Sequence, residues 1–249
     1  MSDAARIGII SEMLSRLSLP AEDAAAEQLL QYYDLLVERN RVMNLTAITE
    51  FTDVVEKHFA DSLLLAQAVD LQEVSSVIDI GTGAGFPGIP LKIVYPHLQV
   101  TLLDALRKRI AFLDEAVRSL GLSGVRTVHG RAEDLGKDTA YRERYDLSVS
   151  RAVADLSVLS ELCIPFVRTG GTFVSYKSAG AGEEIENAAH AVHLLGGEDP
   201  QVITVVLPQT RQERLLVCIR KSQDTPLSYP RRAGIPAKRP LQADRKISQ

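Results

Sequence analysis

From residue 75 onward, the sequence alternates between short apolar runs and stretches in which apolar residues recur with a helical period. The runs predict strands, and they read SSVIDIG, QVTLLD, GVRTVHG, YDLSVS, GTFVSYK, QVITVVL and RLLVCIR. Helical patterns occur between them at about 88–95, 106–120, 153–168 and 183–195, and Pro165 is expected to end or kink the third. This alternation predicts parallel strands joined by crossover helices that cover both faces of the sheet.

The last two predicted strands are joined only by PQTRQE, so they are expected to pair antiparallel. The fold class that follows is α/β, a Rossmann-like doubly wound sheet that is mostly parallel and has an antiparallel edge.

The chain before and after this region has a different pattern of apolar residues. Apolar residues in the first part recur at helical spacing, as in Ile10, Met13, Leu14 and Leu17. We therefore expect a helical extension at 1–70 packed on the core, an α/β core at 71–221, and a basic, proline-rich arm at 222–249. Four prolines occur in this last part, which favours an extended or partly disordered arm.

Composition narrows the class of protein. The chain has 249 residues, of which 45% are hydrophobic and 24% charged, and this excludes collagen-like, low-complexity and wholly disordered proteins. Its two cysteines, Cys163 and Cys218, have no metal-ligand spacing and are interpreted as buried small apolar residues. No apolar run approaches the roughly 18 residues of a membrane span, and the N-terminus lacks a signal-type apolar stretch. We expect a cytoplasmic protein with no membrane partner.

The strongest local motif is VIDIGTGAGFPGIPL at residues 77–91. Its glycines permit a turn in which the backbone approaches a ligand without interference from Cβ atoms. Pro87 suits the first turn of a following helix, whose amides would face that ligand. The glycines are Gly81, Gly83, Gly85 and Gly88.

A GxGxxG match from Gly83 to Gly88 suggests a dinucleotide, but its register favours another ligand. Asp79 lies in the strand end two residues before the first glycine. A carboxylate there must accept hydrogen bonds from the loop or face a cation. S-adenosylmethionine offers a sulfonium and an ammonium, whereas a pyrophosphate would be repelled.

The ends of the next two strands continue this site. Asp104 lies 19 positions beyond Gly85, where a doubly wound nucleotide site has a carboxylate for the ribose hydroxyls. Its alternative role is as an N-cap of the helix that begins near Leu106, and the two roles are compatible. The third strand is followed by residues 130–134, GRAED, where an adenine could meet a backbone amide and a carboxylate.

Seven segments together resemble the bacterial 16S ribosomal RNA guanine-N7 methyltransferase family, also called glucose-inhibited division protein B. They are MNLTAITE, KHFADSL, DIGTGAGFPGIPL, LLDALRKR, GRAEDL, YDLSVSRAVADL and YPRRAGIPAKRPL, and they run through nearly the whole chain. The resemblance implies a class I methyltransferase that uses S-adenosylmethionine, with S-adenosylhomocysteine as product. It implies N7 methylation of one guanine of 16S rRNA, with the assembled 30S subunit favoured as substrate over free RNA.

The resemblance also assigns site residues. Cofactor contacts fall on Gly81, Phe86, Ala132, Glu133 and Arg151, to which the physical arguments above add Asp79, Gly83, Gly85 and Asp104. The chain departs from common family patterns at Ala105, where serine is frequent, and at Ser178, where glycine is frequent.

Guanine N7 carries an in-plane lone pair and no proton, so its methylation needs no general base. The segment SRAVADL after the fourth strand contains no motif for amine or carbon methylation, and no residue is assigned as general acid or base. No metal is expected. Catalysis should rest on holding N7 in line with the methyl group. Arg151 is expected to close the cofactor pocket, and Lys177 either meets the guanine or its phosphate or is a solvated strand-end lysine.

Several other residues are candidates for RNA contact. Phe86 is predicted to be an exposed aromatic side chain that stacks on a base, or else to pack on its own loop. Asn44, Thr46, Lys57, His58 and Asp61 form a polar cluster, interpreted either as a structural network or as a lip that guides RNA. From Lys221 onward the chain has seven basic and two acidic residues, a net of +5 within an overall −4. The candidate phosphate contacts in the arm are Arg231, Arg232, Lys238 and Arg239.

Two other classes of function stay open on these arguments. An NAD-dependent oxidoreductase would need an identifiable proton donor, and a non-catalytic RNA-binding factor would keep the fold without transfer. Nothing in the sequence implies an oligomer, and a monomer is favoured.

Overall fold

The computed structural model describes residues 1–19, 23–151 and 154–241. A sheet of seven strands has the order β3-β2-β1-β4-β5-β7-β6. The first five strands are parallel, and β7 runs antiparallel to both β5 and β6. The strands are β1 Ser76–Ile80, β2 Gln99–Asp104, β3 Val125–His129, β4 Tyr145–Arg151, β5 Val167–Ser178, β6 Gln201–Val206 and β7 Glu213–Arg220.

This topology confirms the doubly wound α/β prediction and the antiparallel pairing of the last two strands. The antiparallel strand is inside the sheet, however, because β7 inserts between β5 and β6 and leaves β6 as the outer strand. Strand order reverses between β1 and β4, and a ligand site is expected at the carboxyl ends of these strands.

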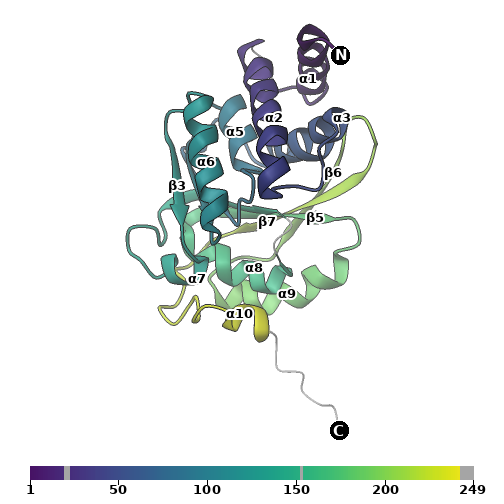
Figure 1. Ribbon diagram of the computed structural model, residues 1–249. Coiled ribbons are helices and arrows are strands. Elements are labelled where there is room, and N and C mark those ends of the chain that lie inside the picture. The colour runs from purple at the N-terminus through teal and green to yellow at the C-terminus, as the bar shows by residue number, and fades with distance from the viewer. Residues whose placement is uncertain (20–22, 152–153, 242–249) are drawn as a thin grey trace.

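Helices precede the sheet and cross over its two faces (Figure 1). Before β1 lie α1 Asp3–Arg16, α2 Asp23–Met43, α3 Phe51–Val54, η1 Val55–Ala60, α4 Asp61–Leu63 and η2 Leu64–Gln67. After it come α5 Gly88–Val94, α6 Arg107–Ser119, α7 Ala132–Leu135, α8 Leu156–Cys163, η3 Ile164–Phe166, α9 Gly182–Leu194 and α10 Ile235–Lys238. The helix predicted at 153–168 ends at Cys163, and Pro165 lies in the short turn η3 that follows.

Two apolar cores lie on opposite faces of the sheet because successive strand residues point to opposite sides. Val77 and Leu102 belong to the core beneath α1, α2, α5 and α6, whereas their neighbours Ile78 and Leu103 belong to the core beneath α8 and α9. Both cysteines are free and buried, as the sequence predicts.

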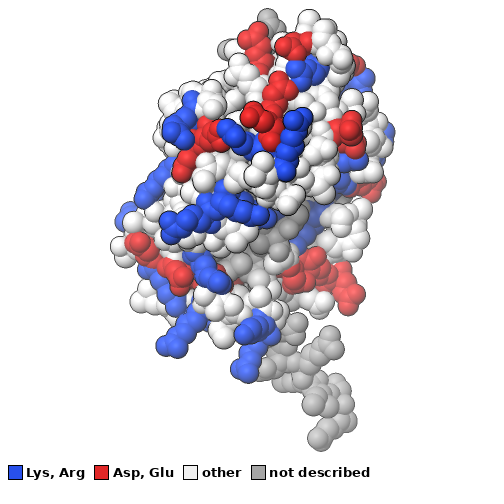
Figure 2. Space-filling view, in the orientation of Figure 1, with Lys and Arg blue, Asp and Glu red and all other residues white. Residues whose placement is uncertain are grey.

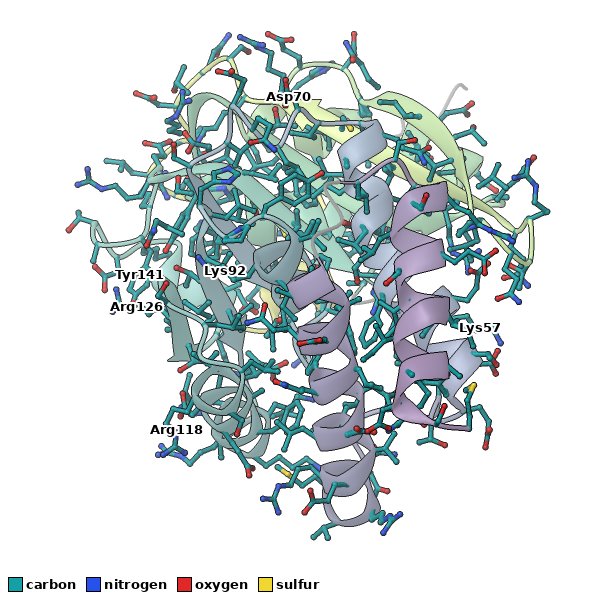
Figure 3. The ribbon with its side chains drawn as sticks, turned by 90° about the horizontal axis from the view of Figure 1, so that it is seen from above. Lys57, Asp70, Lys92, Arg118, Arg126 and Tyr141 are labelled. Atoms are coloured by element: carbon teal, nitrogen blue, oxygen red, sulfur yellow. The ribbon has the colours of Figure 1, made fainter. Side chains whose placement is uncertain are left out.

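The N-terminal helices pack on the face that α5 and α6 cover (Figures 1 and 3). Gln28 of α2 donates to the carbonyl oxygen of Leu120 at 3.1 Å, and Arg39 forms an ion pair with Glu115 of α6. The Tyr32 hydroxyl donates to the carbonyl oxygen of Ala84 in the glycine-rich loop. The helical extension thus reaches the loop that carries the strongest motif.

Residues 222–241 do not form the extended arm that proline content predicts. They run along the lower edge of the molecule and dock against the α8 side through the short helix α10 (Figure 1). Lys221, directly before this segment, is 1% exposed and forms an ion pair of 2.7 Å with Glu143. Residues 242–249 lie outside the described part of the chain. No helix among the described residues is long and apolar enough to cross a membrane.

Candidate functional site

The glycine-rich loop forms a tight turn directly after β1. Gly81, Gly83 and Gly85 have φ values of 71°, 63° and 103°, which disfavour any residue with a Cβ atom. Gly88, at the start of α5, is required for another reason, because a Cβ atom there would lie 2.4 Å from Leu102 Cδ2. The sequence therefore folds here into a tight turn that is held to β2, since the Gly81 and Thr82 amides donate to the carbonyl oxygen of Leu103 at 2.9 and 3.1 Å.

Asp79, in β1, holds this turn in place by hydrogen bonds. Its Oδ2 accepts hydrogen bonds from the Thr82 hydroxyl at 2.6 Å and the Gly88 amide at 2.9 Å, whereas Oδ1 has no partner among the residues that the structure describes. Burial raises the pKa of Asp79 to about 6, although the two hydrogen bonds oppose this shift. The carboxylate thus binds the loop, and it is not among the described residues that line the cavity above the turn.

A cavity of about 450 Å³ opens above the turn, at the carboxyl ends of β1, β2 and β4. Its position is the one expected for a ligand in a doubly wound sheet. We call it the first cavity. The residues that line it are Leu45, Thr46, His58, Gly81, Thr82, Gly83, Ala84, Phe86, Asp104, Ala105, Leu106, Arg109 and Arg151.

Asp104 is the acidic group of the first cavity, although its side chain is only 3% exposed. Its Oδ2 accepts from the Gly83 amide at 3.0 Å and from Arg109 at 3.1 Å, and its Oδ1 accepts from the Leu106 amide at 2.8 Å. A carboxylate offers about four lone-pair positions, so capacity remains for a further donor. The N-cap residue of α6 is Leu106 and not Asp104, so the predicted capping role is wrong, and Asp104 instead holds the chain before α6 while keeping an acceptor position for a ligand.

Two side chains, His58 and Arg151, lie over the Phe86 ring at the side of the first cavity. The rings of His58 and Phe86 are parallel within 21° at a centroid distance of 4.5 Å, and the Arg151 guanidinium lies 5.2 Å from the Phe86 ring centroid. Phe86 is buried against this pair and against Tyr32 and Phe59. The prediction of an exposed Phe86 is wrong, because the helical extension covers the ring.

Hydrogen bonds hold His58 and Arg151 in place. Arg151 NH1 donates to Asp61 Oδ2 at 2.7 Å, and Arg151 NH2 donates to His58 Nδ1 at 3.3 Å. His58 Nε2 is then the protonated nitrogen and donates to the Thr46 hydroxyl at 2.9 Å. Four of the five residues of the predicted polar cluster thus contact one another or Arg151, since the Lys57 carbonyl oxygen also accepts from Arg151 at 3.2 Å.

His58 is held in its neutral form. Burial, and then the charge of Arg151, lower the pKa of His58 to about 4. Since Nδ1 accepts from Arg151 and Nε2 donates to Thr46, neither nitrogen is free to take a proton from a ligand.

A second cavity of about 540 Å³ lies on the other side of Arg151 and His58, which line both cavities. Lys177 lines this cavity but is not a solvated lysine. Its Nζ forms an ion pair of 2.5 Å with Glu184 and donates to the carbonyl oxygen of Ala154 at 2.7 Å. The remaining lining residues are Lys57, Asp61, Tyr176, Ser178 and Arg214.

The predicted site residues therefore divide by position. Gly81, Gly83, Phe86, Asp104 and Arg151 meet around the first cavity together with His58. The others lie near it without lining it: Asp79 and Gly85 beneath the turn, Ala132 and Glu133 in α7, and Asn44 exposed beside the lining residue Leu45.

The candidate RNA contacts of the C-terminal segment also divide. Arg231 is turned inward, where its NH2 lies 2.6 Å from Glu161 Oε2, and Glu161 is fully buried. The prediction that Arg231 contacts an RNA phosphate is therefore wrong, because its guanidinium is already paired with Glu161. Arg232, Lys238 and Arg239 are exposed.

Sequence reasoning missed several lining residues, chiefly Leu45, Leu106, Arg109 and Arg214. Arg109 and Arg214 bind predicted residues, since they form ion pairs with Asp104 at 3.1 Å and with Asp61 at 3.0 Å. The position of Arg109 in the first turn of the helix that follows the acidic strand end could have indicated it. Arg214 is brought to the site by the antiparallel pairing of β7 with β5, in which it opposes Ser178.

In the described ranges, no group of three or more His, Cys, Asp or Glu side chains is arranged to hold a metal ion.

Comparison with known proteins identifies close relatives of the chain. A family model described as GidB, rRNA small subunit methyltransferase G, matches residues 25–215. A protein named ribosomal RNA small subunit methyltransferase G from Lachnoclostridium phytofermentans is 49% identical over 92% of this chain and 94% of its own length. One with the same name from Alkaliphilus metalliredigens is 47% identical over 94% of this chain and 98% of its own.

Solved structures share the fold at low sequence identity. A predicted O-methyltransferase from Agrobacterium tumefaciens has a TM-score of 0.52 at 16% identity, over 66% of this chain and 81% of its own. A putative O-methyltransferase from Klebsiella pneumoniae has a TM-score of 0.51 at 17% identity, over 76% and 90%.

Proposed function

The chain belongs to the GidB family of rRNA small subunit methyltransferases G, and from this we propose that it transfers a methyl group from S-adenosylmethionine to N7 of one guanine in 16S rRNA. The observation that carries the proposal is the first cavity, where the glycine turn, the buried carboxylate of Asp104 and the guanidinium of Arg151 face one space.

The residues around the first cavity fit S-adenosylmethionine. The backbone of the turn at Gly81 and Gly83 carries no Cβ atom and leaves room for the methionine part, and Asp104 has acceptor capacity for a ribose hydroxyl. Arg109 pairs with Asp104 and would shift as a hydroxyl enters. The exposed Leu106 offers an apolar surface for the adenine. When bound, S-adenosylmethionine supplies an electrophilic methyl group.

The second cavity is the proposed place of the guanine. It adjoins the first cavity at Arg151 and His58, and its lining includes Lys57, Lys177 and Arg214. These cations suit a nucleotide phosphate. Lys177 is already paired with Glu184, so its part in binding a phosphate or guanine O6 requires that this ion pair exchange.

The chemistry of the site favours an atom that carries no proton. His58 has both nitrogens engaged and a pKa lowered to about 4, so it is a poor general base. Guanine N7 needs none, because its lone pair is free at neutral pH. The protein then acts mainly by positioning, which can supply roughly 7–11 kcal/mol of a reaction barrier.

Charge on the surface supports a polyanionic partner despite the net charge of −4. Basic side chains cross the middle of one face, at the level where α6 begins, and others project around α7 and α10 (Figure 2). The first turn of α6 contains Arg107, Lys108 and Arg109, of which Arg109 lines the first cavity. We assign the exposed Arg232, Lys238 and Arg239 to phosphate contacts on the same partner.

Transfer of a labelled methyl group from S-adenosylmethionine to undermodified 30S subunits, compared with free 16S rRNA, tests the function and its substrate together. The proposal expects incorporation into the rRNA of the subunit and less into free rRNA. Incorporation into neither would overturn it.

Neither alternative function has support of this kind. An NAD-dependent oxidoreductase would need a proton donor at the first cavity, and its one histidine is engaged on both nitrogens. A non-catalytic RNA-binding factor does not account for the cavity above the glycine turn.

A further inference from the structure

The C-terminal segment 222–241 is bound to the short helix that sits beside the cofactor site. α7 comprises only four residues and follows β3, whose last residue, His129, pairs in the sheet with Asp104. The Gly130 amide donates to the carbonyl oxygen of Asp104 at 3.1 Å. α7 therefore starts next to the carboxylate proposed to bind the ribose. A helix of one turn has little stability of its own, so its external contacts decide its orientation.

Two contacts connect α7 to the C-terminal segment. Oε1 of Glu133 in α7 accepts a hydrogen bond of 2.9 Å from the Gly234 amide. Arg142 NH1 donates both to the carbonyl oxygen of Gly136, directly after α7, at 2.9 Å and to that of Tyr229 at 2.8 Å. A Cβ atom on Gly136 would lie 2.9 Å from the Pro230 ring, so the segment also packs tightly against the end of α7.

A buried ion pair anchors the segment itself. Arg231 donates to both oxygens of Glu161 in α8, from Nε at 2.9 and 3.1 Å and from NH2 at 2.6 Å, and its amide donates to Oε1 at 2.7 Å. Arg231 NH2 also donates to the carbonyl oxygen of Arg239 at 2.8 Å, which closes the chain around Gly234. Glu161 is 0% exposed, so this carboxylate depends on Arg231 for compensation of its charge.

We infer that residues 222–241 are a clasp that holds α7 in the orientation needed to bind S-adenosylmethionine, and that Arg231, Glu161 and Arg142 are positioning residues for the cofactor. The inference rests on the proposed use of this cofactor. The sequence alone predicts an arm that contacts only RNA. The inferred clasp differs from this prediction, because it makes the affinity for the cofactor depend on residues 222–241.

The test measures the dissociation constant of S-adenosylhomocysteine by calorimetry on the full chain. The double variant Arg231→Met with Glu161→Met removes the anchor without leaving a buried charge. Since changes in such networks shift coupling by about 0.5–2 kcal/mol, we expect the dissociation constant to rise about two- to thirtyfold, while kcat at saturating cofactor and RNA stays within about twofold. Leu227→Ala is the matched control in the same segment, because Leu227 is 88% exposed, and it should bind as the wild type does.

Two further measurements distinguish positioning of α7 from a general loss of protein stability. The conservative variant Arg231→Lys retains the charge and should restore part of the affinity. By linkage, saturating S-adenosylhomocysteine should slow hydrogen exchange at the Gly234 amide of the wild type. A double variant that is folded at the assay temperature and binds within twofold of the wild type would overturn the clasp. A wild type that does not bind the ligand would instead overturn the proposed function.

Discussion

Arg151 donates a hydrogen bond of 2.7 Å to Asp61, and this contact ties the carboxyl end of β4 to the helices that precede the sheet. Asp61 also binds Arg214 at 3.0 Å, so one buried carboxylate joins the helical extension, the parallel part of the sheet and its antiparallel strand. The wall shared by the two cavities is therefore built from three parts of the chain that are far apart in sequence.

We expect Arg151→Lys to lower kcat/KM for methyl transfer by about 10- to 100-fold, since hydrogen bonds to charged groups contribute about 1.5–3 kcal/mol. Lysine keeps the charge but cannot bind Asp61 and His58 together or present a planar group to Phe86. Steady-state transfer to 30S subunits measures the effect. Full activity in Arg151→Ala would show that the assigned role is wrong.

Asp104→Asn should weaken S-adenosylmethionine binding by about 10- to 100-fold, because an amide has a weaker acceptor oxygen for the ribose and can no longer pair with Arg109. Equilibrium binding to the full chain measures this loss. Asp114→Asn is a suitable control, since Asp114 accepts a hydrogen bond from Thr127 of β3 and does not line the first cavity. An unchanged affinity in Asp104→Asn would exclude the ribose contact.

His58 makes stability depend on pH in a defined direction. Its folded pKa of about 4 lies below its ordinary value near 6.5, so it contributes stability above pH 6.5 that is lost as the pH falls toward 4. The full loss is about 3 kcal/mol. Urea unfolding at pH 7 and pH 4.5 should therefore show a smaller pH-dependent decrease in His58→Gln than in the wild type. Equal decreases would mean that His58 is not held neutral.

Asp79 acts with the opposite sign. Its folded pKa of about 6 lies above its ordinary value, so the stability it contributes is complete at low pH and is lost as the pH rises from about 4 through 6. Asp79→Asn should remove this loss, and its unfolding free energy should fall less between pH 4 and pH 7 than that of the wild type. The same urea series measures it, and parallel curves for the two proteins would contradict the raised pKa.

Replacement of Arg232, Lys238 and Arg239 by glutamine should weaken RNA binding at low salt. The slope of log K against log salt should become shallower by about 2–3, as three phosphate contacts are lost. The control is Arg16→Gln on α1, which lies at the opposite end of the molecule from α10 (Figure 1). An unchanged slope would show that the three side chains do not contact phosphates.

The sheet and the core of the site were predictable because their signals are local. A glycine with positive φ, such as Gly83, and an acidic strand end, such as Asp104, are marked by residue type and spacing. The burial of Phe86 was not predictable, since the covering residues Tyr32, His58 and Phe59 come from helices that precede the loop by many residues.

The docking of the C-terminal segment was missed for a similar reason. Proline content and charge predict an extended arm, and Arg231 has the same local sequence context as its exposed neighbour Arg232. Only the fold shows that Arg231 faces the buried Glu161, which is 70 residues away in sequence. The net charge of the segment therefore counts Arg231 as a surface cation, although its charge is paired with Glu161 inside the protein.

The most direct test of the proposed chemistry is identification of the methylated nucleoside. Undermodified 30S subunits would be incubated with the protein and S-adenosylmethionine, and the 16S rRNA digested and analysed by chromatography and mass spectrometry. We predict 7-methylguanosine at one position, formed at a rate that does not depend on deprotonation of His58. Methylation of an exocyclic amine, a ring carbon or a ribose hydroxyl would contradict it.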